Sequence, residues 1–325
     1  MTVLVTGASG HIGANLTREL LRQKRPTRVL IHNDARGVKG LDLEIKKGDI
    51  LDYPSLIRAV KGCDVVYHLA ARISIVGDRK GQVRQTNVRG TQNIIKACLQ
   101  NRVKRLVHFS SIHAYCAFPL DQPIDETRPF SDSSSPVYDC SKADGTKEIL
   151  EAAKTGLDAV VISPTAVIGP NDFGPSRMGK VLMKLYHQKF IALINGGYDW
   201  VDVRDVVRGA LRAEKEAESG SQFILSGHWR SILQIAEIVR ELRGIKPPRF
   251  TAPIWMARLA APFSELWARI RKTNPLLTTE ALKALETHRF ICRTQAEDSL
   301  DYHPRPLKQT IQDTLEWFDN KGMLD

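Results

Sequence analysis

The stretch Gly7-Ala8-Ser9-Gly10-His11-Ile12-Gly13 decides the fold, because it joins a short apolar run to a helical pattern. The run before it, Val3–Thr6, is typical of a buried strand, and Ala14–Lys24 after it is typical of a helix. The first glycine permits a tight turn and the second lets the backbone approach a pyrophosphate. The third lets helix and strand pack with no Cβ between them. The free N–H groups at the helix start would face the phosphates. The stretch therefore predicts a dinucleotide-binding βαβ unit.

The alternation of apolar runs and helical patterns continues to residue 165. Five further runs predict strands: Arg28–Ile31, Leu43–Lys46, Val65–Leu69, Leu106–Ser110 and Ala159–Ser163. Helices are predicted over Val83–Gln100 and Val137–Lys154. This order predicts an α/β fold, a Rossmann-type doubly wound parallel sheet over residues 1–165. We expect segments within about 196–228 to return to it, and 166–325 to form mostly a smaller, helical substrate lobe.

Composition restricts the class of protein. The 325 residues are 42% hydrophobic and 26% charged, which is ordinary for a globular protein. The five cysteines include no CxxC pair, so we expect reduced thiols in a cytoplasmic protein and no metal site. The net charge of +11 suits a phosphate-bearing cofactor. Because Lys and Arg are dispersed, no nucleic-acid partner is expected.

The Trp255–Arg271 stretch combines apolar and basic residues that could rest on a membrane. Pro262 is expected to divide Ile254–Arg271 into two pieces, because proline interrupts a helix. Short pieces make a poor interfacial helix. Membrane contact is therefore the less favoured expectation.

Tyr138-Asp139-Cys140-Ser141-Lys142 places a tyrosine and a lysine four residues apart near the start of a predicted helix, hence on one face. A free tyrosine has a pKa near 10, and a nearby ammonium favours its phenolate. A depression of two to three units would require roughly 3–4 kcal/mol. The pair predicts proton transfer to or from a carbonyl or alcohol oxygen. The alternative is a surface tyrosine beside a solvated lysine.

The glycine loop and the Tyr138–Lys142 pair together resemble the extended branch of the short-chain dehydrogenases/reductases, in the NAD-dependent epimerase/dehydratase superfamily. Within it the chain is similar to dihydroflavonol-4-reductase-like and 3β-hydroxysteroid-dehydrogenase-like members. The resemblance implies catalysis by Ser111, Tyr138 and Lys142, with Ser111 preferred to Ser110 because it lies four residues before Tyr115. Many members pair through the two long helices, so the resemblance also implies a homodimer.

The same resemblance implies a set of cofactor contacts along the first half of the chain. They are Gly7, Ser9, Gly10, His11, Ile12, Gly13, His32, Arg36, Asp49, Ile50, Leu69, Ala70, Ala71, Asn87, Tyr138, Lys142, Pro164 and Val167. His32 stands where the family usually carries an acid, and Arg36 follows it; both could receive a 2′-phosphate. Asp34 would argue the other way if it pointed inward. We expect NADP(H) rather than NAD(H).

The expected reaction is the reduction of a ketone or aldehyde, or oxidation of the matching alcohol, on an apolar or ring-bearing small molecule. Phe173, Met178 and Trp200 are predicted substrate contacts. A nucleotide-sugar epimerase or dehydratase with tightly bound NAD is one alternative. It is weakened because Ser163 and Ala166 stand where sugar-nucleotide members usually carry Arg and Asn. The other alternative is a non-catalytic dinucleotide sensor or assembly protein, which commonly lacks the Tyr or the Lys.

Overall fold

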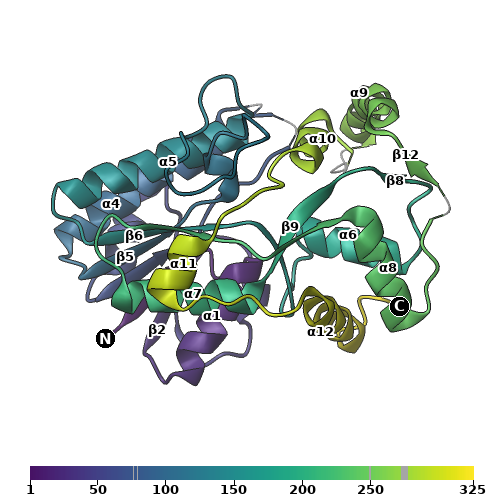
Figure 1. Ribbon diagram of the computed structural model, residues 1–325. Helices are drawn as coiled ribbons and strands as arrows, with labels where there is room; N and C mark the ends of the chain where they lie inside the picture. The colour runs from purple at the N-terminus through teal and green to yellow at the C-terminus, as the bar shows by residue number, and fades with distance from the viewer. Residues whose placement is uncertain (76, 79, 249, 272–276) are drawn as a thin grey trace.

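The computed structural model describes residues 1–75, 77–78, 80–248, 250–271 and 277–325 (Figure 1). Its centre is a seven-stranded sheet in the order β10-β6-β5-β4-β1-β2-β3, in which every pair of neighbours is parallel. The strands are β1 (Val3–Thr6), β2 (Thr27–Ile31), β3 (Glu44–Lys47), β4 (Val65–His68), β5 (Arg105–Phe109), β6 (Ala159–Pro164) and β10 (Gln222–Leu225). This is the Rossmann-type α/β fold that the sequence predicts.

Helices cover both faces of this sheet because its strands are apolar on both sides. Successive side chains of β1 alternate: Val3 and Val5 join one buried cluster and Leu4 joins another. The first cluster lies under α1 (His11–Arg22), α7 (Val203–Glu216) and α11 (Thr294–Leu300). The second lies under α2 (Tyr53–Val60), α4 (Gly90–Gln100) and α5 (Val137–Lys154).

The C-terminal region has its own core, centred on the fully buried Trp200. It contains the sheet β11-β9-β7 and the pair β12-β8. These strands are β7 (Ala166–Ile168), β8 (Leu193–Ile194), β9 (Gly197–Asp202), β11 (His228–Ser231) and β12 (Thr251–Ala252). Its helices are α6 (Arg177–Tyr186), α8 (Ile232–Arg243), α9 (Ile254–Arg271), α10 (Thr279–Glu286) and α12 (Leu307–Asn320).

Two helix predictions need correction. The predicted helix over Val83–Gln100 is α3 (Gln82–Arg84), a π-helical turn over Gln85–Arg89, and then α4. The predicted break at Pro262 is wrong, because α9 runs through it as one helix. A proline there leaves the carbonyl of Arg258 without its helical partner. Both residues are exposed, so water can satisfy that carbonyl.

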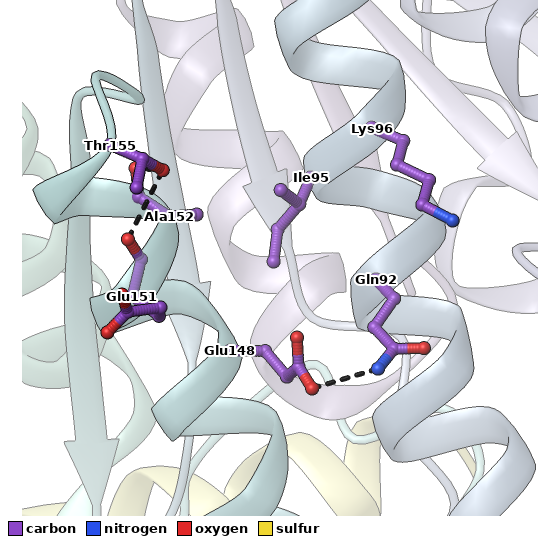
Figure 2. Close-up of a pocket in the computed structure, with 7 residues that line it drawn as sticks. All are labelled: Gln92, Ile95, Lys96, Glu148, Glu151, Ala152 and Thr155. Carbon is purple, nitrogen blue, oxygen red and sulfur yellow. Dashed lines mark hydrogen bonds between the residues drawn. The ribbon is translucent and has the colours of Figure 1, made fainter.

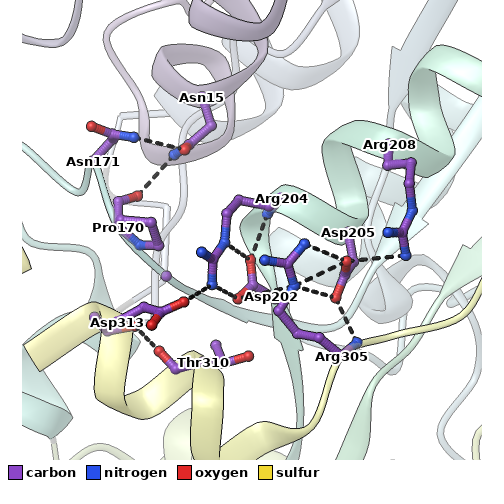
Figure 3. A network of polar contacts seen from close by, with 12 residues as sticks. Asn15, Pro170, Asn171, Asp202, Arg204, Asp205, Arg208, Arg305, Thr310 and Asp313 are labelled. Carbon is purple, nitrogen blue, oxygen red and sulfur yellow. Dashed lines mark hydrogen bonds and ion pairs between the residues drawn. The ribbon is translucent and has the colours of Figure 1, made fainter.

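A buried charge network fastens the chain end to α7 (Figure 3). The carboxylates of Asp202 and Asp205 are fully buried. Arg305 lies 2.9 Å from Asp205, and Arg204 lies 2.7 Å from Asp202 and 2.6 Å from Asp313 of α12. Burial alone would raise the pKa of Asp202, but hydrogen bonds and charge from Arg204 hold that pKa below its ordinary value. Each buried carboxylate is therefore matched by an arginine.

Candidate active site

The glycine loop fits a dinucleotide. Gly7 has φ +72°, and a Cβ there would lie 2.7 Å from the backbone N of Ala70. At Gly13 a Cβ would lie 2.2 Å from the carbonyl O of Gly7, so any larger residue would push the loop away from the helix. No described side chain caps α1 at Gly10. The first amides of α1 thus remain available to a phosphate.

Neighbouring loops are held against this helix start by buried polar groups. Thr6 Oγ1 lies 2.9 Å from His68 Nδ1 and accepts a hydrogen bond of 3.3 Å from Ala70 N, which fixes the predicted contact loop at Leu69, Ala70 and Ala71. Burial, aided by the charge of Lys142, lowers the pKa of His68 to about 3, so this imidazole is neutral.

His11 joins the glycine loop to the chain after β7. Its Nε2 lies 3.1 Å from the carbonyl oxygens of both Gly169 and Pro170. Asn15 donates to Pro170 O at 2.9 Å, a contact visible in Figure 3. Pro164 ends β6 and Val167 lies in β7, on the segment that leads to this junction.

Asn87 connects the loop after β4 to α5. Its Oδ1 accepts from Arg72 N at 2.7 Å, and its Nδ2 donates to Arg72 O at 3.0 Å and to Ser141 Oγ at 2.9 Å. Asn87 sits in the π-helical turn, whose backbone packs so closely that a Cβ on Gly145 would lie 2.8 Å from Asn87 O. The extra residue of the π turn therefore coincides with a tight helix contact beside the site.

Ser111 and Tyr138 meet at the end of β5. Ser111 caps the short turn after the strand, where its Oγ accepts a hydrogen bond of 3.3 Å from His113 N, and its hydroxyl acts on the pKa of Tyr138. Burial raises the pKa of Tyr138 to about 12, while the Ser111 hydroxyl and the charge of Arg177 act in the opposite direction. Ser110 instead lies 2.6 Å from Thr146 Oγ1 and fastens β5 to α5.

Lys142 is buried, with 4% of its surface exposed, and its Nζ donates to the carbonyl of Phe109 at 2.7 Å. Burial lowers the pKa of Lys142 to about 8. The groups that lower the pKa of Tyr138 here are Ser111 and Arg177, and the role of Lys142 toward Tyr138 stays a prediction. The lysine is directed at the strand end instead.

Two residues beside Tyr138 were not anticipated. The His113 ring lies edge-on to Tyr138 with ring centroids 5.9 Å apart, and its Nδ1 is 3.4 Å from Asp139 Oδ1. Arg177 begins α6, and burial lowers its pKa while the phenols of Tyr138 and Tyr198 favour its charge. Neither residue belongs to the Tyr138–Lys142 motif. No sequence pattern indicates that His113 and Arg177 lie beside Tyr138, because only the tertiary packing brings them there.

The adenosine end is more open. Arg36 forms an exposed ion pair of 2.8 Å with Asp34, and His32 Nε2 lies 3.5 Å from Asp49 Oδ2. The Asp49 Oδ1 atom also accepts from Leu51 N at 2.9 Å. The buried Ile50 packs against the start of α4, where a Cβ on Gly90 would lie 2.5 Å from Ile50 Cδ1.

The predicted substrate contacts take part in packing within the chain. Trp200 is fully buried in the C-terminal core, and its indole N–H donates to Arg230 O at 3.0 Å. Phe173 packs edge-on against Trp317, with centroids 5.1 Å apart, and under the guanidinium of Arg18. Met178 packs against the C-terminal core. Their hydrophobicity reflects packing within the chain.

A surface groove of about 350 Å³ lies between α4 and α5 (Figure 2). Gln92 donates across it to Glu148 at 2.8 Å. Its α5 residues lie in the second half of that helix, away from Tyr138, so this groove is not the active site. The homodimer expected through these helices stays a prediction.

Comparisons with known proteins agree with this geometry. The model of the NAD dependent epimerase/dehydratase family matches residues 3–225. Sterol demethylase protein B of Methylococcus capsulatus is 29% identical over 100% of both chains. A putative dihydroflavonol 4-reductase of Synechocystis is 28% identical over 98% of this chain and 94% of the relative. The crystal structure of gox2253 is 28% identical, with a TM-score of 0.86 over 100% of this chain and 99% of that chain.

The fold, the glycine loop with the uncapped start of α1, and the family match define a dinucleotide-dependent enzyme of the extended short-chain dehydrogenase/reductase type. The chain belongs to the NAD-dependent epimerase/dehydratase family, as its motifs indicate.

The buried Lys142 generates a prediction about stability. Because its pKa falls from 10.5 in the unfolded chain to about 8 in the folded one, the unfolded state binds the proton more tightly. The contribution of this group to stability is therefore lowest below pH 8, and it rises by about 3 kcal/mol as the pH passes from about 8 to 10.5. The Lys142→Met variant should lack this rise in its free energy of unfolding.

The measurement is denaturant unfolding of both proteins across this pH range. Lys147→Met, on the exposed side of the same helix, is the matched control and should follow the wild type. Parallel curves for wild type and Lys142→Met would show that Lys142 is not buried as a charge.

Proposed function

We propose that the protein is an NADPH-dependent reductase of a ketone or aldehyde on an apolar or ring-bearing small molecule, and that it also catalyses the reverse oxidation. The observation that carries the proposal is that Ser111, Tyr138 and the buried Lys142 converge at the end of β5. These groups lie at the edge of the sheet formed by the carboxyl ends of its strands, and the glycine loop lies at the same edge. The relatives' names, a sterol demethylase protein and a dihydroflavonol reductase, support a ring-bearing substrate.

When bound, the nicotinamide supplies the hydride in reduction and accepts it in oxidation. The Ser111 hydroxyl donates a hydrogen bond to the substrate oxygen and fixes its position. Tyr138 transfers its phenolic proton to that oxygen as negative charge develops there, giving an alcohol. In the reverse direction the tyrosinate removes the alcohol proton.

Arg177 and Ser111 assist this proton transfer. A tyrosine whose pKa is about 12 holds its proton firmly, and both groups stabilise the phenolate that remains after transfer. Asp139 acts against them, because its negative charge raises the pKa of Tyr138. The His113 Nδ1 atom lies 3.4 Å from that carboxylate.

The residues that would hold the cofactor are those that fit it in shape and charge. The amides at the start of α1 would bind the pyrophosphate, and Lys142 would reach the ribose next to the nicotinamide. Arg36 and His32 would bind a 2′-phosphate. The ion pair of Arg36 with Asp34 is exposed, so the guanidinium can exchange that partner with little loss.

The Tyr138→Phe substitution should lower kcat by about 10²–10⁴-fold, because it removes the proton donor. Affinity for NADPH should remain nearly unchanged. The measurement is a panel of aromatic and alicyclic ketones followed at 340 nm, with cofactor affinity from fluorescence titration. Tyr53→Phe, a surface tyrosine that donates to Gln100, is the matched control. An unchanged kcat would contradict the mechanism, and firmly retained NAD without net turnover would favour an epimerase.

Replacing Arg36 with Ser should weaken NADPH binding by about tenfold or more, because a charge-assisted contact to the 2′-phosphate is lost. Binding of NADH, which lacks that phosphate, should not change. Arg22→Ser removes another exposed arginine that is paired with a carboxylate, and should affect neither cofactor. Equal losses of affinity for NADPH and for NADH would show that Arg36 does not bind the 2′-phosphate.

A further inference from the structure

Six large apolar side chains of the C-terminal region point into solvent, and we call them the docking patch. They are Ile191, Phe250, Trp255, Met256, Leu259 and Phe263, exposed by 95, 72, 61, 48, 66 and 75%. A contiguous apolar surface of this kind usually marks an interaction site.

Helix α9 carries most of this patch, with large apolar side chains facing solvent and small ones facing the core. Over residues 254–264, where burial is described, the buried residues are the small Ala257 and Ala261, and Ile254 at the helix start packs against the same core. The outward face carries Trp255, Leu259 and Phe263, which are spaced four residues apart and so align along the helix. A helix that only had to stabilise the fold would place its large side chains inward.

The patch continues from the helix onto an adjoining strand pair. Strand β8 pairs in parallel with β12, and Leu193 N donates to Phe250 O at 3.0 Å. This pairing brings the chain near Ile191 beside Phe250, and α9 begins two residues after β12. Figure 1 shows α9, β8 and β12 together at the end of the molecule opposite α4.

The two stretches of chain that supply the patch are basic. The stretches 173–198 and 242–264, which supply all six residues, each contain four Lys or Arg residues and no Asp or Glu. Lys189 and Lys246 among them are exposed. Arg258 is exposed as well, and it forms an ion pair with Glu286 of α10. Apolar and aromatic side chains next to basic ones form the composition that binds anionic lipid surfaces.

We propose that the docking patch binds the surface of an anionic lipid bilayer, with α9 lying along the interface. A second copy of this chain is a poorer occupant, because two-fold pairing would bring the basic stretches together. In the described part of the chain no helix is long and apolar enough to cross a membrane, so contact would be at the surface. The continuity of α9 through Pro262 supplies the length that two short pieces would lack. The proposal does not depend on the reaction catalysed.

The test is co-flotation of the full chain with vesicles of phosphatidylcholine, alone or with phosphatidylglycerol. The wild type should float with the anionic vesicles and be released by high salt. Leu259→Glu and Phe263→Glu should each weaken this binding by at least about tenfold, because each removes an apolar side chain from lipid and adds a repelled charge. Ile45→Glu, at an exposed residue of the edge strand β3, should bind as the wild type does.

Thermal unfolding by circular dichroism establishes that each variant is folded, since all three positions are exposed. Absence of flotation by the wild type, or equal flotation of Leu259→Glu, would overturn the proposal. So would light scattering that shows a wild-type oligomer dissociated by Leu259→Glu while vesicles capture neither protein. In that case the patch joins two copies.

Discussion

The carboxyl ends of seven parallel strands share one edge of the sheet, and the candidate site depends on this constraint. The glycine loop follows β1, the Leu69–Ala71 loop follows β4, and Ser111 follows β5. Because β4 lies between β1 and β5, these loops become neighbours although they are far apart in the sequence. Helix α5 then adds Tyr138 from its first turn. A sheet of mixed direction would separate these groups.

The same edge contains a group that costs stability. A lysine with 4% of its surface exposed is not what a fold selected only for stability would contain. The surrounding polar network compensates for part of this cost. Thr6, His68, Asn87 and Ser141 hydrogen-bond the loops to one another, so the backbone around the site is fixed before any ligand arrives. The buried charge of Lys142 is thus held in place by a rigid frame.

Sequence reasoning was most successful where local pattern determines structure. The helix predicted over Val137–Lys154 has those bounds in the structure, and β1 is where its apolar run placed it. It failed where packing decides. Trp200 is an aromatic residue of the kind that lines binding sites, but in the structure it fills a core. No periodicity in the sequence distinguishes a core tryptophan from one in a binding site. Pro262 is tolerated because its helix face is exposed, which the residue type alone does not reveal. Arg177 reaches Tyr138 only through the placement of α6.

In the proposed reaction, hydride passes between the nicotinamide and the carbon whose oxygen Tyr138 protonates. The most direct measurement is mass spectrometry of the alcohol formed from a ketone with NADPH deuterated at the hydride position. We expect deuterium on the new carbinol carbon, with one cofactor oxidised for each alcohol formed. Alcohol without deuterium, or an isomerised substrate with no net cofactor oxidation, would contradict it.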